Sequence, residues 1–176
     1  YIYAGLGLGT SAGFAAALYH MLTHAFAKSG LFIAASSLAD ASGDSKRFSD
    51  LRGAGFRNPA AGVCFVFGSL SLVGVPLLGG FVSKLYLGDA ALGRGVLHMW
   101  VMLVALALST LLNTLYFLKT VITLYRPPRE GFVPPPAPPN RLGNATLWIF
   151  AALNLLVGLL ASPIMDAIKQ GLSLFA

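Results

Sequence analysis

Three ionisable side chains follow one another at four-residue intervals in an otherwise apolar stretch: His20, His24 and Lys28. At about 100° per residue this spacing places all three on one face of a helix, and Thr23 lies on the same face. Neutral imidazole both donates and accepts hydrogen bonds and titrates near ambient pH, so the pattern favours proton transfer. The alternatives are histidines that merely pack against a neighbouring helix, or a metal site. A metal site lacks a nearby carboxylate or thiolate, and none is expected.

A further lysine, Lys84, ends the segment VGVPLLGGFVSK. Pro76 lacks a backbone donor and Gly79 and Gly80 have low helix propensity, so a helix should break there. Broken helices in membranes lie inside protein or beside water and mark ion sites, which makes Lys84 a candidate for binding and releasing protons. The alternative is a lysine that reaches the membrane surface. A straight helix from Pro59 favours this alternative, because it places Lys84 about 37 Å along the axis.

Other notable residues have simpler interpretations. Lys119 and His98 lie near opposite ends of one apolar segment, where we expect them at the membrane surfaces. The glycine-rich segment Gly5–Gly13 resembles a nucleotide-binding turn, but no predicted strand precedes it, and small residues that allow close helix packing explain it better. A single cysteine, Cys64, excludes a disulfide framework and a self-contained iron–sulfur cluster.

The composition shows that these ionisable groups lie in a membrane protein. Of the 176 residues, 56% are hydrophobic and 10% are charged, and the mean hydropathy is +0.75. Soluble domains carry about 25% charged residues, so a soluble enzyme is excluded, as is intrinsic disorder. The net charge of +6 arises mostly from residues between apolar segments, which argues against nucleic-acid binding. The sequence begins YIYAGLGLG without an initiator Met, so we expect it to start within a longer protein.

The predicted fold class is an all-α integral membrane domain with about four transmembrane helices. A span needs about 20 helical residues, and suitable apolar stretches cover about 12–38, 59–87, 96–125 and 146–164. The second is expected to be broken near Pro76–Gly80. The connections 40–57 and 126–141 hold seven Lys and Arg residues against two in the others, so they are predicted to be cytoplasmic loops. The second loop is proline-rich and predicted to be extended.

Three segments together resemble the antiporter-like membrane subunits of respiratory complex I. They are HMLTHAFAKSGLF (His20–Phe32), LRGAGFRNP, and SLSLVGVPLLGGFVSK (Ser69–Lys84). The same family includes Mrp-type cation/proton antiporters and energy-converting membrane hydrogenases. The resemblance covers nearly the whole chain, and it implies the C-terminal part of a larger helical bundle. The family's other key groups, a Glu–Lys pair and a further lysine, would lie on earlier helices.

The resemblance also implies a function for the candidate residues. His20, His24 and Lys28 would form a central relay, and Lys84 would be the ionisable residue of the broken helix that passes protons outward. The chain would then be a non-redox, proton-translocating subunit of an NADH:quinone oxidoreductase-type complex. Redox chemistry would belong to partner subunits, so no cofactor is expected on this chain.

The expected partners are the lipid bilayer, other membrane and redox subunits, and protons or Na⁺, with no nucleic acid. The expected location is a bacterial or archaeal plasma membrane. The alternative functions are a subunit of an Mrp-type Na⁺/H⁺ antiporter or of a membrane hydrogenase, and a structural membrane anchor. Sodium usually needs carboxylate or carbonyl ligands, and no acidic residue lies inside the four predicted spans, which favours protons.

Overall fold

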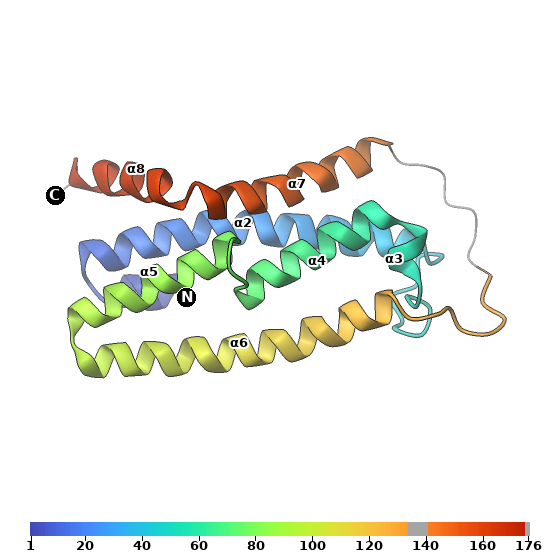
Figure 1. Cartoon of the computed structure of the whole chain (residues 1–176), viewed down its shortest axis with the longest axis horizontal. Helices are drawn as coiled ribbons and strands as arrows, with labels where there is room; N and C mark the ends of the chain where they lie inside the picture. The colour runs from blue at the N-terminus through green and yellow to red at the C-terminus, as the bar shows by residue number, and fades with distance from the viewer. Residues whose placement is uncertain (134–140, 175–176) are drawn as a thin grey trace.

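The computed structural model describes residues 1–133 and 141–174, and it forms an elongated bundle of helices (Figure 1). Every regular element in these ranges is a helix. In chain order the helices are α1 (Ile2–Gly7), α2 (Ser11–Asp40), α3 (Ala54–Arg57), α4 (Pro59–Val73), α5 (Gly79–Arg94), α6 (Val96–Leu124), α7 (Arg141–Leu159) and α8 (Ala161–Ser173). The predicted all-helical fold is confirmed.

Helix α2 is the central element, since α1, α4, α5, α7 and α8 all pack against it. It begins after Thr10, whose Oγ1 accepts a hydrogen bond from the Gly13 backbone N at 3.0 Å. A side chain on Gly13 would collide with the backbone of Gly5, so α1 and α2 touch there through their glycines. The glycine-rich segment therefore serves close helix packing, as the sequence predicted.

The helix break lies where the sequence predicted it. Helix α4 ends at Val73, and Gly74 follows in the left-handed region with a φ of 93°. Helix α5 begins at Gly79, after an irregular segment in which Leu77 also has a positive φ of 76°. Gly80 lies directly against the Ser71 backbone, a contact that leaves no space for a Cβ atom. The two half-helices thus overlap side by side at the break.

The last predicted span differs from the structure. The sequence predicted one stretch over 146–164, whereas the structure begins α7 at Arg141, interrupts it at Leu160 and continues as α8 to Ser173. Pro163 lies in the first turn of α8, where a helix needs no backbone donor. The extended conformation predicted for the proline-rich loop falls mainly on residues 134–140, which lie outside the described residues.

Arg57 organises the first predicted cytoplasmic loop. Its guanidinium donates hydrogen bonds to the Ala41, Arg52 and Asp50 carbonyls at 2.8, 2.8 and 3.0 Å, and to Ser42 Oγ at 2.7 Å. The side chain of Asp50 in turn accepts hydrogen bonds from two serine hydroxyls, which lowers the pKa of that carboxyl. The loop is therefore folded by its own polar groups.

Two described helices, α6 and α7, are long and apolar enough to cross a membrane, and α4 is a shorter apolar helix. Much of α6 is exposed, including Trp100, Leu108 and Leu112. A long apolar surface of this kind suits contact with lipid or with other membrane helices.

Candidate functional site

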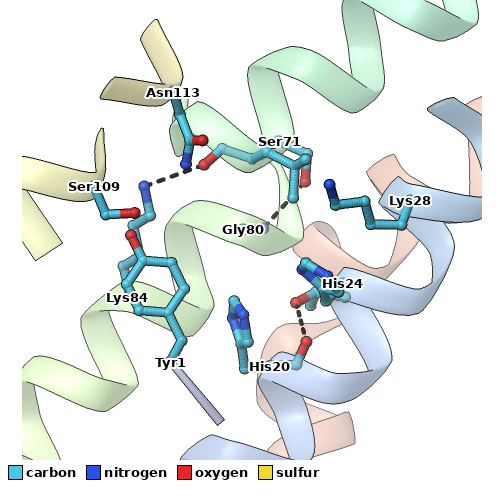
Figure 2. Close-up of a pocket in the computed structure, with 11 residues that line it drawn as sticks. Tyr1, His20, His24, Lys28, Ser71, Gly80, Lys84, Ser109 and Asn113 are labelled. Carbon is cyan, nitrogen blue, oxygen red and sulfur yellow. Dashed lines mark hydrogen bonds between the residues drawn. The ribbon is translucent and has the colours of Figure 1, made fainter. Parts of the chain in front are cut away.

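A cavity of about 210 Å³ lies between α2, the α4–α5 break and α6, next to Tyr1. It is lined by Tyr1, His20, Thr23, His24, Lys28, Ser71, Leu72, Gly80, Lys84, Ser109 and Asn113. Figure 2 shows His24 and Lys28 of α2 on one side, and Lys84 with Ser109 and Asn113 on the other. All four predicted site residues therefore reach one space.

His20 is the buried member of the α2 group. Its Nδ1 lies 3.0 Å from Ser83 Oγ, and Ser83 Oγ donates to the Gly80 carbonyl at 2.9 Å. With the single serine hydrogen donated to the Gly80 carbonyl, His20 Nδ1 is assigned as the donor in the first of these bonds. In the neutral ring, Nε2 is then the nitrogen that accepts a proton.

His24 and Lys28 continue the polar face of α2 from His20. The ring centroids of the two histidines are 5.5 Å apart. The hydroxyl of Thr23, which also lines the cavity, donates to the His20 carbonyl at 3.0 Å. Lys28 is half-buried, and its Nζ lies 5.8 Å from the centre of the Phe32 ring. The four-residue spacing therefore places the three ionisable groups in one row along the cavity.

Lys84, on α5, forms hydrogen bonds to the C-terminal end of α4, the first half of the broken helix. Its Nζ donates to the Val73 carbonyl at 2.6 Å, to the Leu72 carbonyl at 3.3 Å and to Thr110 Oγ1 at 2.7 Å. These carbonyls belong to the last turn of α4, where helical donors are lacking. Lys84 thus turns into the bundle, which differs from the surface position that straight-helix counting favours.

Helix α6 contributes polar groups that the sequence reasoning missed. Ser109 and Asn113 line the cavity, and Thr110 binds Lys84. The available signal was a cluster of neutral polar residues at relative positions i, i+1 and i+4 within a helix of 29 residues that is otherwise largely apolar. Lys119 and His98 of the same helix are exposed and take no part in the cavity.

The side chains that line the cavity are neutral or positively charged, and none of them is a carboxylate. In the part of the chain that the structure describes, no group of three His, Cys, Asp or Glu side chains is placed to hold a metal ion. The arrangement is suited to moving protons between bases and hydroxyls rather than to coordinating a cation.

Comparison with known proteins gives the family. Residues 1–112 match the family described as NADH:quinone oxidoreductase/Mrp antiporter, TM. The chain belongs to this family. The match confirms the resemblance seen in the sequence. It includes the α2 face, the α4–α5 break and Ser109 of α6, and it ends one residue before Asn113.

Curated relatives carry the name NADH-quinone oxidoreductase subunit N. Subunit N 1 of Symbiobacterium thermophilum is 33% identical over 175 residues, which cover 96% of this chain and 34% of that protein. Subunit N of Cereibacter sphaeroides is 33% identical over 174 residues, covering 98% of this chain and 36% of that protein. The chain thus spans about a third of the length of these family members.

Solved structures support the same family fold. A chain of respiratory complex I from Thermus thermophilus with bound aureothin matches 96% of this chain at a TM-score of 0.74 and 26% identity, over 36% of its own length. A chain of the Mrp complex from Dietzia sp. matches 96% at a TM-score of 0.75 and 20% identity, over 39% of its own length. The second likeness is one of fold alone.

Proposed function

We propose that this chain is the part of a complex I-type membrane subunit that carries protons from the centre of the bundle toward the outside. The observation that carries this proposal is the single cavity that brings His20, His24, Lys28 and Lys84 together. Ionisable groups at membrane depth cost about 2.5–3.5 kcal/mol each on insertion scales. Four such groups in one cavity are therefore better explained by a function that uses their charge than by packing alone.

The proposed path follows the geometry. A proton arrives from the cytoplasmic side at Lys28, moves past His24 to His20, and then loads Lys84. His20 suits an intermediate position because Ser83 fixes its Nδ1–H, leaving Nε2 to accept a proton from the cavity. Lys84 holds the proton as an ammonium bound by three oxygen atoms. A change of charge on a neighbouring site then releases it, since charges interact strongly away from bulk water.

The proposed setting is an assembly with other membrane and redox subunits in a bacterial plasma membrane. Relatives named NADH-quinone oxidoreductase subunit N support this setting. Electron transfer and its cofactors belong to the partner subunits. The basic loops 40–57 and 126–141 face the cytoplasm, as the positive-inside rule indicates. The orientation is tested by adding a protease to the cytoplasmic side only, where it should cleave these loops.

Substitution of Lys84 tests the proposal. In the full-length protein within its membrane complex, we expect Lys84→Ala to abolish proton translocation while the complex still assembles. The matched control is Lys119→Ala, which removes the same charge from an exposed position of α6 and should leave translocation unchanged. Dye-quenching in sealed vesicles measures translocation, and native electrophoresis measures assembly.

Two results would contradict this proposal. Normal proton translocation by Lys84→Ala would remove this lysine from the mechanism. Joint loss of assembly and activity in Lys84→Ala and in a His24→Ala variant would favour a structural membrane anchor instead.

A Na⁺/H⁺ antiporter subunit is the second candidate function, favoured by the fold shared with the Mrp complex chain at a TM-score of 0.75. The cavity argues for protons, because Na⁺ prefers oxygen ligands such as carboxylates and none lines it. Transport assays with and without sodium distinguish the two. Translocation that stops when sodium is omitted would favour the antiporter.

A further inference from the structure

Thr110 differs from the other threonines of α6. The hydroxyls of Thr114, Thr120 and Thr123 each donate to the carbonyl four residues earlier in their own helix, at 2.7, 3.0 and 2.9 Å. This is the usual way in which a helical threonine satisfies its hydroxyl. The Thr110 hydroxyl instead accepts a hydrogen bond from Lys84 Nζ at 2.7 Å, across the interface between α5 and α6.

The three partners of Lys84 Nζ are not equivalent. The Leu72 and Val73 carbonyls are acceptors only, whereas a hydroxyl both accepts and donates. An ammonium group has three hydrogens, and the three oxygen atoms match them. After one proton leaves for an acceptor in the cavity, the amine keeps two hydrogens and gains a lone pair. The two carbonyls can retain the two hydrogens, but only the Thr110 hydroxyl can turn and donate to the lone pair.

We propose that Thr110 is a positioning residue for Lys84, whose hydroxyl keeps the lysine nitrogen at the helix break in both protonation states. The hydroxyl rotates during the proton transfer and neither gains nor loses a proton. This inference rests on the proposed function of Lys84 in proton translocation. It adds a residue on α6 that acts through the lysine and holds it where the next proton arrives.

Among the groups around Lys84, Thr110 is the one whose hydroxyl already bonds the lysine nitrogen. The titratable groups that share the cavity with Lys84 are His20, His24 and Lys28 of α2 and the Tyr1 ring, which lies 5.8 Å from Lys84 Nζ. Among the described lining residues, α4 and α6 add only neutral groups: Ser71, Leu72, Ser109 and Asn113. No described carboxylate is available in the cavity to hold the lysine in place of the hydroxyl.

Two substitutions of Thr110 distinguish the contribution of its hydroxyl from that of the shape of its side chain. In the assembled complex, we expect Thr110→Val to lower proton translocation about tenfold, the effect of losing one hydrogen bond to a charged group. The pH profile should also move to lower pH, because the hydrogen bond that the hydroxyl accepts from the charged lysine is stronger than the one it donates to the neutral amine. Thr110→Ser retains the hydroxyl and should restore both the rate and the profile. The control Thr120→Val removes a hydroxyl that bonds within its own helix, away from the cavity, and should change neither.

A structure of the Thr110→Val complex gives a readout that does not depend on transport. We expect the Lys84 nitrogen to leave the Val73 carbonyl, or its density to spread over several positions. If Thr110→Val prevents assembly, Thr110→Ala is used instead. It also removes the hydroxyl, and its smaller side chain disturbs the packing less.

The outcomes distinguish this inference from the proposed function. If Lys84→Ala abolishes translocation while Thr110→Val retains the normal rate, pH profile and lysine position, the role of Thr110 is overturned and that of Lys84 stands. A Thr110→Ser variant as impaired as Thr110→Val overturns the role of the hydroxyl. Normal translocation by Lys84→Ala overturns the proposed function and this inference with it.

Discussion

At the scale of single residues, Ser83 links the histidine row to the broken helix. It accepts from His20 and donates to the Gly80 carbonyl, so one hydroxyl fixes the orientation of a buried imidazole. Orientation matters because a proton relay needs a defined donor and a defined acceptor on each ring. Ser83 is fully buried at 0% exposure, and no other partner of His20 Nδ1 is seen among the described residues.

We therefore expect Ser83→Ala to slow proton translocation and to destabilise the fold by about 1–3 kcal/mol, since it leaves a buried N–H without an acceptor. The matched control is Ser69→Ala, at a buried serine of α4 whose hydroxyl donates to Phe65 of its own helix. Thermal unfolding and vesicle transport measure the two effects. Equal behaviour of the two variants would argue against the orienting role.

The sequence predicted the charged part of this site but not its neutral part. His20, His24 and Lys28 could be found because ionisable groups at helical spacing are rare in an apolar segment. Ser83 could not be found in this way, because an isolated serine is common in membrane helices and bonds to its own backbone. The cluster that contains Thr110 indicates a polar face on α6, but it does not show which partner that face meets. The roles of Ser83 and Thr110 depend on how three helices meet, which no single-helix pattern records.

At the scale of elements, the α4–α5 break positions Lys84. Gly74 allows the left-handed turn that ends α4, and Gly80 allows the start of α5 to touch the Ser71 backbone. The Gly80 backbone N also donates to Ser71 Oγ at 3.3 Å, which ties the two half-helices together. The distance from Lys84 to the α4 carbonyls depends on this close contact.

We expect Gly80→Ala to destabilise the protein by about 1–3 kcal/mol, the typical effect of overpacking. The added Cβ atom would collide with the Ser71 carbonyl, so α5 must move and Lys84 must lose its partners. Gly88 lies on the same helix, and a Cβ atom added there would have no neighbour within 4 Å. Gly88→Ala should therefore be neutral or slightly stabilising. Thermal unfolding of both variants checks this, and an undisturbed Gly80→Ala would contradict the close contact.

The two helix breaks differed in how well the sequence predicted them. The first was predicted because Pro76 and two glycines lie in the middle of the apolar stretch. The second, at Leu160, was missed because the residues around it are apolar and match a continuous helix. Pro163 alone does not specify a break, since proline fits the first turn of a new helix as well as the end of an old one.

At the scale of the whole molecule, the bundle separates its basic and apolar surfaces. The loop 41–53, which contains Lys46, Arg47 and Arg52, lies at the end of the bundle that also holds α3, far from the turn between α5 and α6 (Figure 1). Between these ends, α6 exposes a long apolar surface. This distribution is typical of a protein that crosses a bilayer in one orientation, and it places the cavity between the two ends.

The central claim is that this cavity is a hydrated proton path inside the membrane, and a high-resolution map of the full-length protein in lipid tests it most directly. We predict ordered water molecules that join Lys28, the two histidines and Lys84 into one hydrogen-bonded chain. A map in which Lys84 and both imidazoles face lipid or bulk water, with no water inside the bundle between them, would contradict the account.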